Sequence, residues 1–362
     1  MASTTKNDVE QLLKDFIDPN LGIDLVSAKA VKKIEVDESR IAVKIVLGYP
    51  ASSIRSELAE TLRSKICRET GIADVVVDLS TDIVSHAVQK NLKPMPGVKN
   101  IIAVASGKGG VGKSTTAVNL ALALSAEGAR VGILDADIYG PSQPTMLGLS
   151  GKPEVDGQSI LPKVAYGVQS MSIGYLIDED TPMIWRGPMV TGALQQLLND
   201  TRWDKLDYLI IDLPPGTGDI QLTLAQQIPV SAAVIVTTPQ DIALLDAQRG
   251  LKMFEKVSVP VLGIIENMSL HVCSNCGHEE PIFGSGGALK MSEKYAVDLL
   301  GSLPLDIRIR EQADSGHPTV VADPLGRSAQ IYREIARKLA GRLALTAKDY
   351  SAKFPTISIV NN

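Results

Sequence analysis

Aromatic residues are scarce in this chain of 362 residues, and two common sequence features are missing from it. Phe, Trp and Tyr together make up 4% of the sequence, so its hydrophobic cores must be built from aliphatic side chains. No apolar run approaches the roughly 18 residues that a membrane-spanning helix needs. The polar first residues lack the apolar centre of a signal peptide. We therefore expect neither a membrane protein nor a secreted one.

Cysteine and positive charge are also in short supply. Three cysteines cannot form the disulfide framework of a small secreted domain, so a reducing cytoplasm is the expected compartment. The formal net charge of −5 argues against a general nucleic-acid-binding protein, because such proteins present a basic surface to phosphates. The length of the chain favours two domains.

The most informative stretch is residues 107–115, which follow an apolar run and open into a helix-prone run. A strand, a glycine-rich turn and a helix N-terminus in this order form a phosphate-binding loop, in which backbone N–H groups surround the anion. Lys113 is expected to contact the β- and γ-phosphates, and the Ser114 hydroxyl to ligate Mg²⁺. The predicted nucleotide-binding residues of the loop are Gly107, Lys108, Gly109, Gly110, Val111, Gly112, Lys113, Ser114 and Thr115. The chain is therefore predicted to bind a nucleoside triphosphate.

A second lysine, Lys108, directly follows the first glycine of the loop, where a plain phosphate loop has no use for it. A solvated side chain is one interpretation. The run Lys-Gly-Gly-Val-Gly-Lys-Ser-Thr also resembles the deviant Walker A motif of dimerising ATPases. These include the Mrp/NBP35 iron–sulfur carriers, the MinD and ParA proteins, and nitrogenase iron protein. The resemblance implies that Lys108 reaches the nucleotide of a partner subunit, and therefore that the chain forms a homodimer.

Short apolar segments alternate with helical patterns from residue 100 onward. Strands are expected at 101–105, 131–134, 168–172, 208–211, 232–237, 260–265 and 299–303, and a last helix at 327–345. The strands are almost continuously apolar, as strands covered on both faces are. This pattern predicts an α/β fold with a mostly parallel sheet flanked by helices. The resemblance identifies it as a P-loop NTPase of the SIMIBI type, with the phosphate loop at the carboxyl ends of the strands.

The first part of the chain shows a different pattern, typical of a small α+β domain. It consists of a helix over 7–17, strands over 30–36 and 41–47, a helix from Ser52 or Ser53 to Gly71, and a strand near 75–79. Asp18-Pro19 and Tyr49-Pro50 resemble hallmarks of the MIP18-like (DUF59) domain, which implies an accessory or partner-docking module. Some members carry a cysteine just after the second proline, where this chain has Ala51-Ser52-Ser53. The predicted boundaries are 1–88 for this domain, 89–99 for a linker, 100–346 for the ATPase domain and 347–362 for a tail.

Carboxylates follow two of the predicted strands. Asp135 and Asp137 come directly after the strand 131–134, and Asp212 comes after the strand 208–211. Capping is the alternative for either of the first two alone, but these strand ends are expected to lie beside the phosphate loop. Asp212 fits a Walker B role, in which a carboxylate holds Mg²⁺ through water. The resemblance to Mrp-type ATPases implies that Asp135 also lies near Mg²⁺, so the predicted magnesium residues are Ser114, Asp135 and Asp212.

Two blocks around these carboxylates resemble the switch segments of Mrp-type ATPases. The block 135–142, Asp-Ala-Asp-Ile-Tyr-Gly-Pro-Ser, resembles switch I, which implies that Asp137 orients the attacking water. The block Leu-Pro-Pro-Gly-Thr-Gly after Asp212 resembles switch II, in which Gly216 brings a backbone N–H to the γ-phosphate and responds when it leaves. The implied reaction is in-line phosphoryl transfer to water. Its predicted catalytic residues are Lys108, Lys113 and Asp137.

Asn267 follows the strand 260–265 and matches the family position that contacts adenine. The resemblance therefore implies ATP rather than GTP as the nucleotide. An amide in a loop after a strand is otherwise a common turn residue, which remains the alternative.

Cys273 and Cys276 lie two residues apart in a loop after the same strand, flanked by His271 and His278. This spacing lets both sulfurs face one metal. A redox dithiol and a structural zinc site completed by the two histidines are open alternatives. A [4Fe–4S] cluster usually takes four thiolates, so the pair is interpreted as half a site. The homodimer implied by Lys108 would supply the other half.

The resemblance supports this interpretation, because Mrp/NBP35 proteins carry C-x-x-C at this place and bridge a labile cluster between subunits. The block 183–189, Met-Ile-Trp-Arg-Gly-Pro-Met, is also typical of them and absent from MinD and ParA. Its Arg186 could serve as an arginine finger or in a conformational or interface role. The implied function is a cytoplasmic homodimeric ATPase that carries a [4Fe–4S] cluster to apo iron–sulfur proteins, with cluster-assembly factors as further partners.

Two alternatives to this function stay open. A MinD- or ParA-like positioning ATPase would bind membrane or DNA, but residues 347–362 lack the basic amphipathic helix that such binding requires. We therefore expect no nucleic-acid or membrane partner. The other alternative is an ATPase with a structural zinc ion at the cysteine pair.

Overall fold

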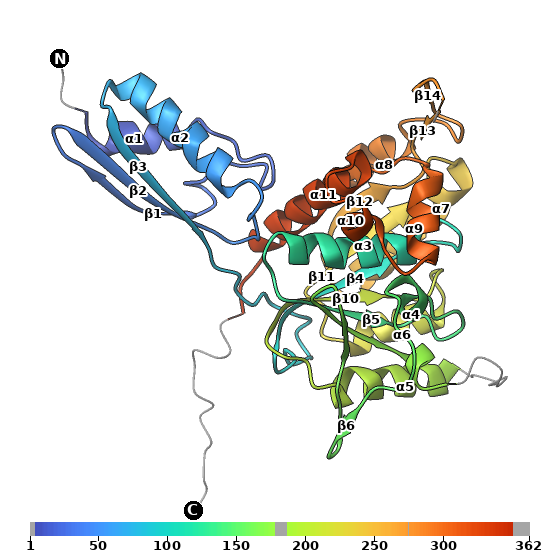
Figure 1. Cartoon of the computed structure of the whole chain (residues 1–362). Helices are drawn as coiled ribbons and strands as arrows, with labels where there is room; N and C mark the ends of the chain where they lie inside the picture. Colours follow the sequence, from blue (N-terminus) through green and yellow to red (C-terminus); the bar gives the residue numbers. More distant parts are fainter. Residues whose placement is uncertain (1–3, 178–186, 274, 350–362) are drawn as a thin grey trace, which may run out of the picture.

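Two main sheets, each with its own helices, organise the chain (Figure 1). The computed structural model describes residues 4–177, 187–273 and 275–349. Arg186 and the part of the predicted tail beyond residue 349 lie outside the described residues. Within those ranges, no helix is both long enough and apolar enough to cross a membrane.

The smaller sheet belongs to the N-terminal part of the chain, as the sequence predicts. Its strands are β1 (Val31–Val36), β2 (Arg40–Leu47) and β3 (Asp74–Thr81), with β1 antiparallel and β3 parallel to β2. Helices α1 (Lys6–Lys14) and α2 (Arg55–Thr70) pack against it (Figure 1). Alternate residues of β2 are buried, since one face of this sheet packs against the helices.

The two proline-containing pairs of this unit meet in the structure. Buried Tyr49 donates a hydrogen bond to Oδ2 of buried Asp18 at 2.6 Å, and Oδ1 of Asp18 accepts from the Asn20 backbone N–H at 2.8 Å. The helix predicted over 7–17 ends earlier, at Lys14. The reason is that Asp18, which precedes Pro19, disfavours the helical conformation, and the Asp18 side chain forms the hydrogen bonds of this buried turn.

The larger sheet has the strand order β15-β12-β11-β4-β10-β5-β9-β8. The strands are β4 (Val98–Ala105), β5 (Val131–Asp135), β8 (Lys163–Ala165), β9 (Val168–Ser172), β10 (Leu206–Asp212), β11 (Ala232–Thr237), β12 (Val261–Glu266) and β15 (Leu299–Ser302). All are parallel except β8, which pairs antiparallel with β9 at the edge. The seven strands predicted in this region and their parallel arrangement are thus confirmed.

Helices cover both faces of this sheet, which explains why its central strands are almost continuously apolar. On β4, Ile102 and Val104 join one hydrophobic core, while Ile101 and Ala103 join another on the opposite face. The first core includes α3 (Lys113–Ala126), α10 (Thr319–Ala322) and α11 (Arg327–Ala344). The second includes α5 (Gly187–Asp200), α6 (Asp219–Gln227), α7 (Asp241–Lys256) and α8 (Gly287–Tyr295). Shorter elements are α4 (Gln143–Met146), α9 (Ile307–Asp314) and the turn η1 (Ile173–Tyr175).

Some short strands were not predicted from the sequence. Besides β8, they form two small hairpins, β6 (Val155–Asp156) with β7 (Ser159–Ile160), and β13 (His271–Val272) with β14 (Glu279–Glu280). Each has only two or three residues, too few to produce an alternating or continuous apolar pattern. The second hairpin brackets the cysteine pair.

The N-terminal unit is joined to the larger one at the far end of α3. Glu127, which follows α3 directly, accepts hydrogen bonds from the Ser53 hydroxyl at 2.6 Å and the Ser53 backbone N–H at 3.0 Å. From α11, Arg333 and Arg337 pair with the same carboxylate at 2.9 and 2.8 Å. Ser53, in the segment just after Pro50, therefore serves as a contact between the two units.

The first residues of the predicted tail are attached to the segment that precedes β4. The Ala87 N–H donates to the Ala347 carbonyl at 2.8 Å, and the Asp349 N–H donates to the Ser85 carbonyl at 3.0 Å. The chain through Asp349 is therefore part of the folded unit.

Candidate nucleotide site and cysteine hairpin

The phosphate loop lies between the end of β4 and the start of α3, as the sequence predicts. Gly112 caps α3 with φ +79°, in the left-handed region that favours glycine. A Cβ atom at this position would also collide with the side-chain amide of Asn267. At the other end of the loop, a Cβ at Gly107 would collide with the backbone of Asp246 in α7. These two glycines let the loop pack tightly against its neighbours.

The predicted carboxylates reach the loop because of the strand order. The central strand β4 lies between β10 and β11, and β10 in turn pairs with β5. In the register of β10 with its neighbours, Asp212 stands opposite Asp135 on one side and Val104 on the other. Both carboxylates are fully buried at the carboxyl ends of their strands. The structure thus brings Asp135 and Asp212 to the mouth of the phosphate loop.

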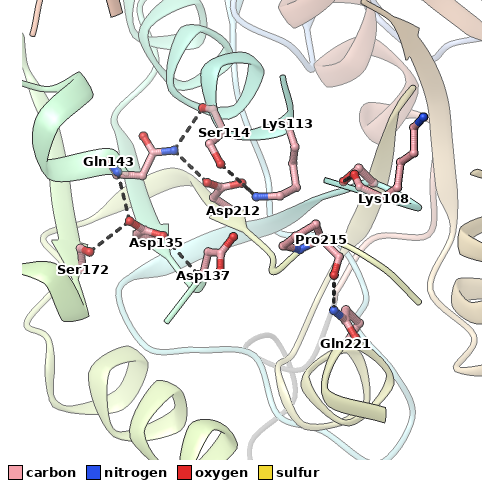
Figure 2. A network of polar contacts seen from close by, with 11 residues as sticks. Lys108, Lys113, Ser114, Asp135, Asp137, Gln143, Ser172, Asp212, Pro215 and Gln221 are labelled. Carbon is pink, nitrogen blue, oxygen red and sulfur yellow. Dashed lines mark hydrogen bonds and ion pairs between the residues drawn. The ribbon is translucent and has the colours of Figure 1, made fainter. Parts of the chain in front are cut away.

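The side chain of Lys113 is bonded to Asp212 (Figure 2). Its Nζ pairs with Asp212 Oδ1 and donates to the Ser114 hydroxyl at 3.0 Å. The other oxygen of Asp212 accepts from Nε2 of Gln143 at 2.9 Å. Sequence reasoning did not select Gln143. It follows the switch I block as an ordinary helix-start residue, and nothing in its neighbours indicates that its side chain reaches Asp212.

Asp135 is held by three donors. Its Oδ2 accepts from the Gln143 backbone N–H and from the Ser172 hydroxyl, both at 3.1 Å, and its Oδ1 accepts from the Asp137 N–H at 3.2 Å. Burial, followed by the nearby charge of Asp212, raises the pKa of Asp135 to about 7. Burial also raises the pKa of half-buried Asp137. Ser172 lies at the end of β9, and it too was absent from the predicted site.

This set of residues fits Mg²⁺. The donors that face one another are carboxylate and hydroxyl oxygens, from Asp135, Asp212 and Ser114, and such hard oxygen ligands are those that Mg²⁺ prefers. Two buried carboxylates side by side also favour a cation between or beside them. Ser114, Asp135 and Asp212 are therefore the residues that would hold the ion.

The switch II segment packs against the entry of the phosphate loop. Gly216, with φ +104°, donates its N–H to the Ser106 carbonyl at 2.9 Å. Nε2 of Gln221 donates to the Pro215 carbonyl at 2.6 Å and steadies the turn (Figure 2). The N–H group that was expected to reach the γ-phosphate therefore has another partner, which it must leave to do so.

Lys108 and Asn267 differ in how they relate to the phosphate loop. The half-buried side chain of Lys108 points away from the pair of Lys113 and Asp212 (Figure 2). Asn267, just after β12, is buried and donates from Nδ2 to the Val111 carbonyl at 2.9 Å. Asn267 thus contacts the loop directly, whereas Lys108 does not face the centre of its own site.

The cysteine pair lies in the connection between β13 and β14. The hairpin is closed by a bond from the Cys273 N–H to the His278 carbonyl at 2.9 Å, and the Gly277 N–H donates to the Cys273 carbonyl at 2.9 Å. Cys273 is partly exposed, Cys276 is exposed, and neither forms a disulfide. Hydrogen bonds from the backbone N–H groups of Cys276 and Asn275 lower the pKa of the Cys273 thiol. The pair is therefore accessible, and the lowered pKa of Cys273 favours the thiolate form, which is the form that metals bind.

The described part of the chain adds no further ligand to these two sulfurs. No group of three or more His, Cys, Asp and Glu side chains converges on a common point within the ranges that the structure describes. Nδ1 of His271 lies 3.3 Å from the Leu305 carbonyl instead. The zinc site with both histidines, considered above, is thus not assembled in the described part of the chain.

Comparison with known proteins gives two family matches. Residues 97–340 match the family described as NUBPL iron-transfer P-loop NTPase, and residues 6–78 match the family described as iron-sulfur cluster assembly protein. The two matches correspond to the larger and the smaller sheet, respectively.

Relatives of similar length extend these matches. The chain is 54% identical over 333 residues to an iron-sulfur cluster carrier protein of Escherichia coli K12, covering 91% of this chain and 90% of that protein. It is 47% identical over 309 residues to the mouse iron-sulfur cluster transfer protein NUBPL, covering 82% and 97%.

Among solved structures, the chain resembles a nucleotide-binding protein from Archaeoglobus fulgidus in complex with ADP. The identity is 37% and the TM-score 0.57, covering 65% of this chain and 91% of that one. The cell division ATPase MinD of Pyrococcus furiosus shares the fold, with 24% identity, a TM-score of 0.51 and coverage of 66% and 97%.

Proposed function

The chain belongs to the NUBPL iron-transfer P-loop NTPase family, and we propose that it carries an iron–sulfur cluster and delivers it to apo iron–sulfur proteins. Its P-loop fold and its family make it an ATPase. The N-terminal unit, proposed to span residues 1–88 and to join the ATPase domain of 100–346 through 89–99, would contact cluster-assembly factors or recipients. Its match to the iron-sulfur cluster assembly family supports this assignment.

The observation that carries the proposal is the exposed cysteine pair without further ligands. Cys273 and Cys276 offer two thiolates on a hairpin, and the described residues add no third ligand. A [4Fe–4S] cluster usually takes four. A symmetric homodimer that brings two hairpins together supplies them, and it leaves the cluster at the subunit interface, where a recipient can reach it.

ATP hydrolysis in this proposal begins with an exchange of partners. Lys113 turns from Asp212 to the β- and γ-phosphates, and the Gly216 N–H turns from the Ser106 carbonyl to the γ-phosphate. Asp137 orients the attacking water. Mg²⁺, held by Ser114, Asp135 and Asp212, would neutralise charge on the phosphates. Hydrolysis then releases the switch segments, and the altered subunit geometry changes how the cluster is held.

Two further residues are assigned roles in nucleotide binding, one within its own subunit and one across the homodimer interface. Asn267, which lies against the phosphate loop, is proposed to contact adenine and so to select ATP. Lys108, which points away from its own Lys113 and Asp212, is proposed to reach the nucleotide of the partner subunit (Figure 2). The loop thus contributes to two nucleotide sites in the homodimer.

Anaerobic reconstitution with iron and sulfide tests the cluster site. We expect about four iron atoms per dimer in the parent protein, and loss of the cluster in the double variant Cys273→Ser, Cys276→Ser. Cys67→Ser is the matched control, because Cys67 lies on α2 of the N-terminal unit, and it should retain the cluster. A double variant that keeps as much cluster per dimer as the parent contradicts the proposal.

The same preparations separate the alternative functions. Zinc in place of iron and acid-labile sulfide in anaerobically isolated protein would indicate a structural metal site. ATP-dependent co-sedimentation with liposomes or DNA would indicate a positioning ATPase. The similarity to MinD gives that alternative no further support, since it shows the fold alone.

A further inference from the structure

Gln143 connects three parts of the nucleotide site (Figure 2). Its Nε2 donates to Asp212 Oδ2 at 2.9 Å and to the Ser114 carbonyl at 3.1 Å, while its backbone N–H donates to Asp135 Oδ2 at 3.1 Å. The residue is fully buried. The nitrogen of its amide must face Asp212, since the reversed amide would place oxygen against oxygen. One glutamine at the start of α4 therefore contacts the phosphate loop and the ends of both acidic strands.

Asp212 is held from two sides in this arrangement. Lys113 occupies Oδ1 and Gln143 occupies Oδ2. Binding of a triphosphate requires Lys113 to turn toward the phosphates, which removes its ammonium group from Oδ1. Among the side-chain contacts of the described residues, the bond from Gln143 is the one that then still fixes the orientation of Asp212.

The other end of the Gln143 amide indicates that the residue is present for this contact and not for packing. Its Oε1 is buried without a hydrogen-bond partner within the described ranges. A buried acceptor without a partner is unfavourable. A methionine or leucine would fill similar space without that penalty, but it would leave Asp212 Oδ2 and the Ser114 carbonyl without their donor.

The neutrality of the Gln143 side chain also indicates a role in orienting Asp212. A lysine or arginine at this position would neutralise Asp212 with a fixed positive charge and compete with a divalent cation, whereas a glutamate would repel both carboxylates. A neutral donor orients Asp212 and leaves its negative charge available.

We propose that Gln143 is a positioning residue that fixes the Asp212 carboxylate for Mg²⁺ and ties it to switch I. This role rests on the ATPase function proposed above. It predicts that the contribution of Mg²⁺ to nucleotide binding depends on Gln143, while the contacts of the phosphates with the loop backbone do not.

The test compares Gln143→Met with the parent in the full-length protein, using ADP as the probe. We expect the affinity for ADP in EDTA to stay within twofold. The gain in affinity on adding Mg²⁺ should fall about tenfold or more, which is the typical effect of losing a hydrogen bond to a charged group. The Mg²⁺ concentration for half-maximal ATP hydrolysis should rise by a similar factor, with the rate recovering at high Mg²⁺. Gln330→Met is the matched control, because the Gln330 amide also donates to a backbone carbonyl, that of Pro324, and neither residue belongs to the set assigned to the nucleotide site.

A purely structural role for Gln143 would lower the melting temperature and leave the Mg²⁺ dependence unchanged. A folded Gln143→Met protein whose Mg²⁺-linked gain and half-saturation stay within twofold of the parent therefore overturns the proposal. If that variant does not fold, Gln143→Asn is measured in the same way, since its shorter amide cannot span both Asp212 and the Ser114 carbonyl. The cluster experiment fails separately from this one: unchanged Mg²⁺ dependence refutes the role of Gln143 and leaves the cysteine site in place.

Discussion

Replacing Glu127 by alanine should loosen the N-terminal unit from the ATPase unit. Its buried carboxylate accepts from the Ser53 hydroxyl and N–H and pairs with Arg333 and Arg337. The substitution leaves buried Arg337 without this partner, and breaking a buried ion pair from one side costs about 3–5 kcal/mol. Because Arg333 keeps part of its contact with water, we expect the loss of stabilising free energy to be near the lower end of this range, about 3 kcal/mol.

Hydrogen exchange is the suitable assay, since a two-domain chain does not unfold in one step. Peptides that cover the start of α2 and the middle of α11 should lose protection. A cost of about 3 kcal/mol corresponds to a factor of roughly 150 in the opening equilibrium. Peptides from the central strands β4 and β10 should exchange as in the parent, because their hydrogen bonds do not involve Glu127.

The effect should also depend on pH. Burial alone would raise the pKa of Glu127, but hydrogen bonds from Ser53 and the charges of Arg337 and Arg333 outweigh it and lower the pKa below its ordinary value of 4.5. A carboxylate with a lowered pKa stabilises the fold above its unfolded pKa, and that contribution is lost as the pH falls through the folded pKa. The difference between parent and variant should therefore be full at pH 7 and shrink below pH 4.5.

Glu60→Ala is the control for this prediction. Glu60 lies on the exposed face of α2 and pairs with Arg63 at 2.7 Å, and an exposed surface pair of this kind contributes little to stability. Equal protection of the α2 and α11 peptides in the two variants would refute the assigned role of Glu127.

Two further predictions concern the phosphate loop. Gly112→Ala should weaken ADP binding by more than about tenfold and lower the melting temperature, because φ +79° and the contact with Asn267 leave no room for a Cβ. Gly109→Ala is the control: its Cβ would meet nothing within 4 Å, so the melting temperature should stay unchanged. Equal effects of the two substitutions would contradict this prediction. Lys108→Ala should keep the affinity for ADP within a few-fold of the parent. It should reduce steady-state phosphate release about 100-fold or more, which is the scale expected for losing a cation that stabilises the transition state. An unchanged rate of phosphate release would show that Lys108 takes no part in catalysis.

The parts of the fold that depend on long apolar patterns were predictable from the sequence. The strands β4, β5, β10 and β11 are covered by helices on both faces of the sheet, so their central segments are almost continuously apolar. The hairpin β13–β14 could not be found in this way. It consists of His271-Val272 and Glu279-Glu280, whose pairing depends on main-chain bonds around the cysteine loop.

Site residues that belong to a sequence motif could be predicted, whereas residues that reach the site only through the tertiary fold could not. Lys113, Asp135 and Asp212 lie at a glycine loop and at strand ends, which the sequence marks clearly. Gln143 and Ser172 carry no such mark, because a neutral polar residue after a turn is common. Their importance arises from the strand order, which places β9 next to β5 and β5 next to β10.

The segment between Asn267 and Cys273 has a consequence for how this protein can vary. Asn267 is bonded to the phosphate loop, and Cys273 begins the hairpin turn only six positions later. Even fully extended, that tether spans no more than about 20 Å. The Ser269 and Leu303 main chains, and those of Leu305 and Leu270, are hydrogen-bonded, so the tether is also fixed along its length. An insertion or deletion there would shift the cysteines relative to the nucleotide, so the length of this short segment sets the distance at which the hairpin stands from the phosphate loop.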